Sequence, residues 1–474
     1  MATYGSFPGV RVTTRSGGIT SIAIGEEEKL VIFGEANYDN SNNVDGDDPS
    51  LSIDTSSPVQ IVSNNDANDK FGSDSELADA MIAARSNGAN IDFLYGVAVP
   101  REDVAGESIS GSSGATGTLG NTEIVEDVST ISFDNSLTVE FRYDGAPSTD
   151  GGYASGEVPD DTIFINPLTG EYAVTSGSVA SAPTTIDYTY NDYASAFNAS
   201  DVQSVVNEDE TGIYLSLSDA DAVNSSLQSA VNALRQNFQL VNGLAGAEPN
   251  DFELLSAAGT RGGADARYDT DTYDSTGSQS VTEEYMYLFA PVRLENESAT
   301  LLGSIGGLFA GNPIEDPIYN EALAGVSGVE QTFSKSDADN MRAEDIIPVR
   351  NAGAVRVKGN RSTAFSEADA VAADFWTRRI TDRVILIAKQ VGDRIIGRIN
   401  DAETRDQARR LIEAEMRELV RDRLIRSNAG DETNWFVEVS EDATNADEVN
   451  IDVSFTPYGI VKRVDETITV DTSV

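Results

Sequence analysis

The chain has 474 residues and a formal net charge of −47, from 79 acidic and 32 basic residues, and it contains neither cysteine nor histidine. These absences exclude disulfides, thiolate or imidazole metal sites, and Ser-His-Asp or Cys-His nucleophilic catalysis. The acidic excess argues against direct binding to nucleic acid, which needs a basic surface. The length allows two or three domains. Because the acidic residues are spread along most of the chain, they indicate a protein built for concentrated salt.

The sequence has no feature of a membrane or exported protein. No apolar run approaches the roughly 18 residues needed to cross a bilayer, so we expect no direct membrane contact. The start, MATYGSFPG, lacks the charged region and apolar stretch of a signal peptide. We therefore expect assembly in the cytoplasm of the host, an extreme halophile.

The first predicted element is a short strand at the N-terminus, within FPGVRVTTRSGG (7–18). Val10 and Val12 alternate with polar residues, and Gly17 and Gly18 end the strand. No hairpin turn links this strand to a neighbour, so its backbone groups need a partner from elsewhere.

An α/β pattern follows. Residues 29–36 read as a buried strand, 73–89 as a helix with a capping box from Ser73 to Glu76, and 91–99 as a second strand. The acidic loop at 42–50 could hold a calcium ion, but it lacks the full spacing of a calcium loop, and a solvated loop is the favoured interpretation.

A β-rich module then interrupts the α/β pattern. Alternating runs lie between residues 137 and 190, two of them joined by the turn NPLTGE (166–171), which predicts an inserted sandwich. The α/β pattern returns with a helix at 218–234 and strands at 238–246 and 285–292.

The segment LLGSIGGLFAGN (301–312) is rich in small residues. It has neither the lysine nor the glycine spacing of a phosphate-binding loop, so it predicts a closely packed helix instead.

The last third of the chain carries most of the arginine, with 17 of the 26 arginines after residue 340. Residues 365–427 hold 13 basic and 12 acidic residues, a net charge of +1. Helical spacing predicts helices over 381–400 and 401–425, with the second carrying the i,i+4 pairs Asp406–Arg410 and Glu413–Arg417. Two interpretations stay open for the second helix: a surface helix laced with ion pairs, or a helix docked on a partner through complementary charge.

Alternating strands are predicted at 434–441 and 449–457, and a second terminal strand at 466–472 contains Ile468 and Val470. Lone strands at both ends suggest that each adds to a sheet in a neighbouring copy, which generates rings or helical filaments. The alternative is that both ends pair with the sheet of their own subunit.

Motifs in order along the chain resemble the sheath protein of contractile phage tails and related injection machines, including archaeal virus tails. The resemblance covers roughly residues 7–100 and 236–474, is most specific from 321 to 425, and departs from the usual pattern at AGNPIEDPIYNEAL (310–323). The matching stretches are FPGVRV, GGITSI, LVIFGEA, FGSDSELADAMIAARSNGA, LVNGLAG, EALAGVSGVEQTF, DIIPVRNAGAVRVKGNRST and WTRRITDRVILIAKQVGDRIIGRIN.

This resemblance implies an α+β multidomain fold whose terminal arms are exchanged between subunits. The expected parts are an N-terminal strand arm (1–22), a split α/β domain (23–103 and 236–345), a β-rich outer insertion (104–235), a C-terminal inner core domain (346–463) and a C-terminal strand arm (464–474). It further implies hexameric rings stacked helically around an inner tail tube protein, with baseplate and tail terminator proteins as further partners. Contraction then drives the tube through the target envelope, without enzymatic activity or a cofactor.

By position, the resemblance makes Val10, Val12, Ile468 and Val470 residues of the strand arms. The candidates for contact with the tube or adjacent subunits are Arg405, Asp406, Arg409, Arg410, Glu413 and Arg417. The expected location is the tail of a virion. The alternatives weighed are a secreted or surface-layer structural protein of a halophile and a carboxylate-dependent hydrolase.

Overall fold

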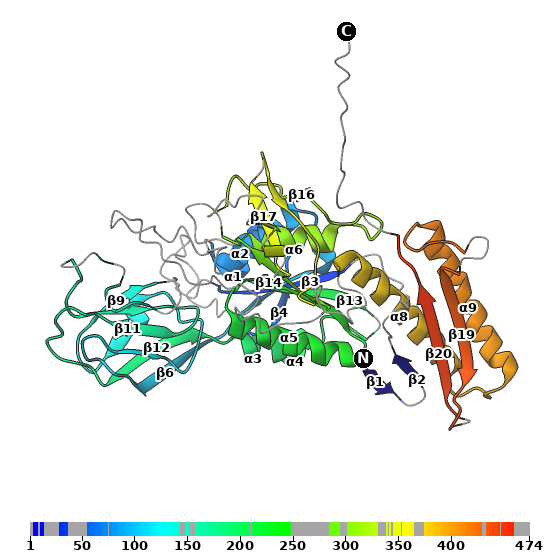
Figure 1. The fold of residues 1–474 in the computed structure, drawn as a ribbon, viewed down its shortest axis with the longest axis horizontal. Coiled ribbons are helices and arrows are strands. Elements are labelled where there is room, and N and C mark those ends of the chain that lie inside the picture. Colours follow the sequence, from blue (N-terminus) through cyan, green and yellow to red (C-terminus); the bar gives the residue numbers. More distant parts are fainter. Residues whose placement is uncertain are drawn as a thin grey trace, which may run out of the picture.

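The structure, a computed structural model, shows an elongated molecule with a nine-stranded sheet in the middle, a β-rich unit at one end and a helix-and-strand unit at the other (Figure 1). None of the described helices is long and apolar enough to span a membrane. The structure describes residues 3–7, 10–13, 28–36, 55–73, 75–142, 147–151, 153, 157–208, 210–247, 284–293, 301–329, 338–339, 341–342, 345–351, 353–364, 374–428, 433–445 and 447–458.

The central sheet has the strand order β16-β18-β17-β15-β14-β13-β3-β5-β4. Neighbouring strands from β17 through β5 run parallel, whereas β4, β18 and β16 are antiparallel at the two edges. The strands are β3 (Lys29–Gly34), β4 (Pro58–Gln60), β5 (Leu94–Ala98), β13 (Thr211–Ser216), β14 (Leu240–Gly246), β15 (Met286–Ala290), β16 (Glu321–Ala322), β17 (Ile347–Asn351) and β18 (Val355–Val357).

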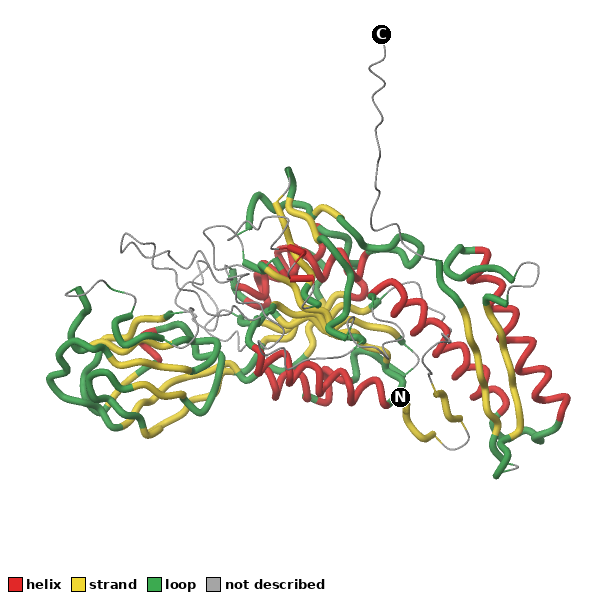
Figure 2. The backbone as a smooth tube through the Cα atoms, in the orientation of Figure 1, coloured by secondary structure: helices red, strands yellow, loops and turns green. Residues whose placement is uncertain are grey.

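Helices cover both faces of this sheet (Figure 2). In β3, Leu30 and Ile32 enter the core on one face, and Val31 and Phe33 enter the core on the other. A strand buried on both faces reads as a continuous apolar run, as predicted for residues 29–36. The first face packs against α1 (Asn64–Phe71), α2 (Glu76–Ser86) and α6 (Leu302–Gly311), and the second against α3 (Tyr193–Asn198), α4 (Ser200–Gln203) and α5 (Asp221–Gln236).

Helix α6 is the closely packed helix that its small residues predict. A Cβ atom added at Gly303 would meet the backbone of Ala80, and one at Gly307 would meet the backbone of Ala84. Gly311 faces Gly88 in the same way. The glycines therefore let α6 and α2 approach backbone to backbone.

The β-rich unit is a two-sheet sandwich, as predicted. One sheet has the order β7-β11-β10-β9 and the other β6-β12-β8, and a shared apolar core lies between them. The turn at 166–171 joins the antiparallel strands β10 and β11. The bounds are β6 (Arg101–Ser108), β7 (Thr116–Thr118), the 3₁₀ helix η3 (Val128–Thr130), β8 (Ser132–Phe133), β9 (Thr138–Phe141), β10 (Thr162–Ile165), β11 (Glu171–Val174) and β12 (Thr185–Asn191).

Several predicted boundaries differ from the structure. The expected end of the insertion at residue 235 is wrong, because β13 lies in the central sheet and α5 packs on it. Helix α2 is capped by Ser75, whose Oγ accepts from the Ala78 amide at 3.1 Å, and not by Ser73. The predicted strand at 91–99 opens with a 3₁₀ turn, η2 (Ile91–Phe93), before β5 begins.

The C-terminal unit contains α8 (Phe375–Ile395), α9 (Ala402–Arg421), β19 (Trp435–Glu441) and β20 (Val449–Phe455), which share one apolar core. Both predicted helices are present, but α8 begins six residues before residue 381 and ends at Ile395 instead of Asn400. The N-terminal strands β1 (Thr3–Phe7) and β2 (Val10–Thr13) complete a four-stranded sheet of order β1-β2-β20-β19.

Candidate assembly surface and the junction pocket

The N-terminal strand lies along the edge of the C-terminal sheet of its own chain. Strand β2 pairs in parallel with β20, Val10 opposite Val449 and Arg11 opposite Asn450. The expectation that this strand has no hairpin neighbour is wrong, because β1 and β2 pair antiparallel. The edge of β20 is thus shown to accept an added strand. The exchange of that strand between subunits stays a prediction.

The other edge of the sheet belongs to β19. In the part of the chain that the structure describes, β19 pairs only with β20, so its second edge offers free backbone groups. Phe436 on this strand is 49% exposed. The predicted C-terminal strand with Ile468 and Val470 lies outside the described residues, and for Val10 and Val12 the structure describes only the backbone.

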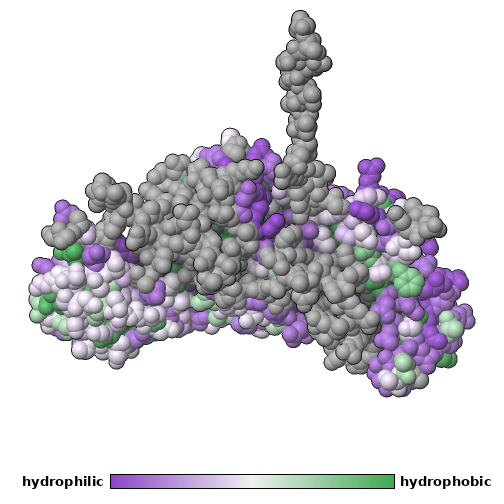
Figure 3. Space-filling view, in the orientation of Figure 1, coloured by the Kyte–Doolittle hydropathy of each residue, from purple (hydrophilic) through white to green (hydrophobic). Residues whose placement is uncertain are grey.

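Helix α9 separates an apolar face from a charged face. Asp401 caps its start by accepting from the Thr404 amide at 2.8 Å. Ala408, Ile412 and Met416 are buried against the strands and α8. The outer face of this end of the molecule is strongly hydrophilic (Figure 3), and the side chains of Arg410, Arg417 and Arg421 are 73%, 63% and 71% exposed.

The charged face of α9 is a ladder of ion pairs within the helix. Asp406 pairs with Arg409 and Arg410, each at 2.6 Å. Glu413 pairs with Arg409 at 2.9 Å and with Arg417 at 3.1 Å. The predicted i,i+4 pairs are thus confirmed. The hydrogen bond from Arg409 holds the pKa of Asp406 below its usual value.

Arg405 differs from the other candidates because it reaches another element. Its Nη1 lies 3.1 Å from the Glu441 carboxylate at the end of β19 and 2.6 Å from the Asn400 side-chain oxygen. Arg405 therefore ties α9 to the sheet, and the five other candidates lie together along α9. Exposed ion pairs add little to stability, which leaves these charges available for contacts between molecules.

A buried charge cluster joins the central sheet to α8. Asp382 accepts hydrogen bonds from Arg235 of α5 and from Arg378 one turn earlier on α8. The Arg235 and Asp382 side chains are each 1% exposed. Beside them, the Arg379 Nε lies 2.8 Å from Glu28 just before β3. Helix α8 is therefore held by charge on the central domain and by apolar contacts on α9 and the strands.

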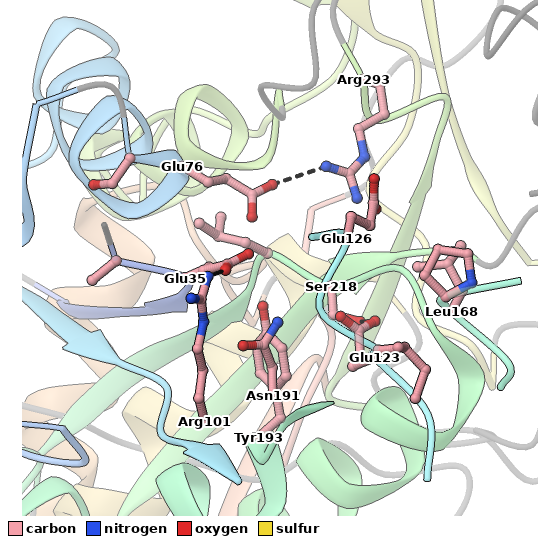
Figure 4. A pocket seen from close by; sticks show the side chains of 15 residues that line it. Glu35, Glu76, Arg101, Glu123, Glu126, Leu168, Asn191, Tyr193, Ser218 and Arg293 are labelled. Carbon is pink, nitrogen blue, oxygen red and sulfur yellow. Dashed lines mark hydrogen bonds and ion pairs between the residues drawn. The ribbon is translucent and has the colours of Figure 1, made fainter. Parts of the chain in front are cut away.

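A cavity of about 340 Å³ lies where the β-rich unit joins the central sheet. Its polar walls carry Glu35, Glu76, Arg101, Glu123 and Arg293, with Glu126, Asn191, Tyr193 and Ser218 beside them (Figure 4). No cluster of three or more acidic side chains arranged for a metal ion occurs among the described residues. The acidic loop at 42–50 lies outside them.

Sequence reasoning missed both the charge cluster and the cavity. Arg235 and Asp382 are 147 positions apart, and only the fold brings them together. Glu123 and Asn191 belong to the inserted unit, whereas Glu76 and Arg293 come from the central domain. The one local signal was the run of charged residues in the first half of α8, at Arg378, Arg379 and Asp382.

The fold of nearly the whole chain is similar to that of chains solved within contractile assemblies. A chain of the anti-feeding prophage baseplate, 6-fold symmetrised, is 13% identical with a TM-score of 0.56, covering 98% of this chain and 99% of that chain. A chain of the anti-feeding prophage helical sheath in the contracted state is also 13% identical, with a TM-score of 0.55 and the same coverage. A chain of the sheath complex of an extracellular contractile injection system, PVC, in the contracted state is 12% identical, with a TM-score of 0.54 over 99% of both chains.

The likeness lies in the fold and not in the sequence. No protein-family model matches the chain, and no curated protein matches it. The agreement nevertheless extends over nearly the full length of both partners in each comparison. The chain has the fold of the contractile sheath proteins.

Proposed function

We propose that the chain is a structural subunit of a contractile tail sheath. Its working form is a set of hexameric rings stacked helically around an inner tail tube protein, and contraction drives the tube through a target envelope. The observation that carries this proposal is the full-length likeness to a chain of a contracted helical sheath, together with a sheet edge that accepts an added strand.

Strand exchange is the proposed means of assembly. In the single chain, β2 lies on the edge of its own β20. In the sheath, the same edge receives the β2 of a neighbour. The two arrangements form equivalent backbone hydrogen bonds, so exchanging an identical element costs little and gives a head-to-tail contact that propagates.

The C-terminal arm takes the second edge. We propose that ETITVDT (466–472) from another subunit adds to the free edge of β19. Each C-terminal sheet would then hold strands from neighbouring copies at both edges. Among the described residues, the C-terminal part of the chain contributes β19 and β20 to this sheet.

The charged face of α9 is the proposed contact with the tube or an adjacent subunit. Residues 365–427 have a net charge of +1 in a chain of −47, so this region lacks the repulsion that separates acidic surfaces. Arg410 and Arg417 are the most exposed of the candidate arginines. Their reversal, Arg410→Glu with Arg417→Glu, should leave the fold intact and reduce sheath formation.

Contraction in this proposal re-packs rigid subunits. The buried cluster around Asp382 and the shared core of α8, α9, β19 and β20 hold each subunit as a unit. The free energy comes from new contacts between subunits and not from nucleotide hydrolysis. Baseplate and terminator proteins at the two ends of the sheath are the further partners, in a virion tail or a related injection machine.

Electron microscopy of the purified chain tests the proposal. The full chain should form hollow striated tubes on standing at high salt. A chain lacking residues 1–13 should remain folded, shown by an unchanged circular dichroism spectrum, yet form no tubes. Monomeric particles from the full chain under all salt conditions would contradict a sheath function.

A further inference from the structure

The cavity between the β-rich unit and the central sheet has the position of a ligand site. Glu35 follows β3, Ser218 follows β13, and Arg293 follows β15, so these side chains come from the carboxyl ends of parallel strands. From β3 the chain continues through β4 and β5 on one side of the sheet, and from β13 it continues to β14 on the other side. Ligands of open α/β sheets bind at such a reversal of strand order.

The inserted unit closes this position from the other side. Glu123, Ile124, Glu126, Leu168 and Asn191 belong to it and line the cavity. The Ser218 hydroxyl donates a hydrogen bond to the Glu123 carboxyl across the junction. The resulting volume of about 340 Å³ lies at the small end of the range for ligand pockets, so it suits a small molecule.

The positive groups of the cavity are already engaged. The Arg293 Nη1 lies 2.9 Å from Glu76, and Arg101 forms an ion pair with Glu35. The N-terminus of α2, which is the positive end of the helix dipole, also lies at this cavity. The Ser75 side chain already accepts from one of its backbone N–H groups, and the Glu76 carboxylate already complements its charge. A bound anion would have to displace these carboxylates.

Two hydrogen-bond acceptors in the cavity wall receive no hydrogen bond from the described residues. The Asn191 side-chain oxygen is buried without a hydrogen-bond partner, and the residue is only 8% exposed. The carboxylate of Glu126 lies beside the same space at an exposed position, and no described residue donates a hydrogen bond to it (Figure 4). A buried acceptor without a donor is costly. A ligand that carries N–H donors and positive charge would satisfy the buried Asn191 oxygen and pair with the charge of the exposed Glu126 carboxylate.

We propose that this junction cavity binds a small organic cation with N–H donors, an alkylammonium or a guanidinium. Asn191 and Glu126 accept its hydrogen bonds, and the ring of Tyr193 forms part of the wall. Because the walls come from both units, the bound cation fixes the β-rich unit on the central domain. This site is independent of the strand exchange proposed for assembly.

Binding should release a proton. Burial raises the pKa of Glu123 to about 8, against lowering contributions from Ser218 and Arg293, with Asp219 and Glu76 raising it further. Tyr193, Glu35, Arg101 and Glu126 are the other titratable groups around the cavity. A cation favours the ionised carboxylate, so affinity increases as the pH rises from 7 toward 9.

Titration calorimetry of the full chain with methylguanidinium at constant high ionic strength tests the site. We expect saturable binding with one molecule per chain. Tetramethylammonium, which has the same charge but no N–H donor, should give no saturation. The proposal would be overturned if methylguanidinium and tetramethylammonium bound equally. It would also be overturned if neither methylguanidinium nor the alkylammonium n-propylammonium gave saturation.

Variants separate the site from non-specific attraction to an acidic protein. Asn191→Asp should tighten methylguanidinium binding, and Asn191→Leu should weaken it about tenfold. Glu126→Gln, at an exposed position that does not threaten folding, should weaken it as well. As the control, Asp69→Asn at an exposed position of α1 should change nothing. Unchanged affinity in both Asn191→Asp and Glu126→Gln would contradict the assignment.

Discussion

Arg235 and Asp382 form an ion pair that joins α5 of the central domain to α8, with Nη1 3.1 Å from Oδ2 and each side chain 1% exposed. Arg378 donates to the same carboxylate at 2.7 Å. Two guanidinium groups therefore share this buried carboxylate, and Arg378 also lies 3.3 Å from the Glu284 carboxylate. This relationship sets the position of α8, and α8 carries the C-terminal sheet.

Removal of that carboxylate charge should destabilise the subunit. In Asp382→Asn, the two buried guanidinium groups lose the carboxylate that they share, although Arg378 keeps its contact with Glu284. Breaking a buried pair in this way costs about 3–5 kcal/mol. Chemical denaturation of the unassembled chain measures the effect. The matched control is Asp69→Asn at an exposed position, which should be neutral. Equal stability of the two variants would contradict the role given to Asp382.

Helix α6 offers a test in which the usual helix preference is reversed. Alanine normally favours a helix over glycine. In Gly307→Ala, however, the new methyl group would meet the backbone of Ala84, and overpacking costs about 1–3 kcal/mol. Gly306→Ala is the control, because its nearest neighbour is the end of the Leu215 side chain, which can move. Thermal unfolding should show the larger loss for Gly307→Ala.

The junction cavity makes stability depend on pH. The pKa of Glu123 is raised from 4.5 to about 8 by burial. A carboxyl group whose pKa is raised in the folded state contributes its full stabilisation below the unfolded pKa. This contribution is lost as the pH rises through the folded pKa. Stability should therefore decrease between about pH 4.5 and pH 8. Denaturation of Glu123→Gln over the same range should show a flatter profile, and an identical slope would contradict this role.

Salt should control assembly. With a net charge of −47, subunits repel one another in dilute buffer, and molar salt shortens the screening length to roughly 3 Å. Tubes formed in molar sodium chloride should therefore dissociate on dialysis to low salt, as measured by sedimentation. An equal yield of tubes across the whole range would contradict the proposal that acidity adapts this chain to concentrated salt.

The sequence predicts those parts of the fold that local patterns determine. The apolar run of β3, the turn between β10 and β11, the small-residue helix α6 and the ion pairs of α9 are all confirmed. The end of the insertion was wrong because the short helices α3 and α4 give weak periodicity before β13. Contacts such as Asn191 with the junction cavity depend on the packing of two units, and no local pattern contains that information.

The most direct test of the central claim locates the partner of β2 in the assembled state. The chain has no cysteine, so Val10→Cys with Val449→Cys introduces one pair, at positions opposite each other in the β2–β20 register and at a separation that suits a disulfide. Oxidation should give a closed monomer from free subunits. From tubes, it should give a ladder of covalently linked subunits on a non-reducing gel, and either single variant should give none. A monomer band alone from tubes would contradict strand exchange between subunits.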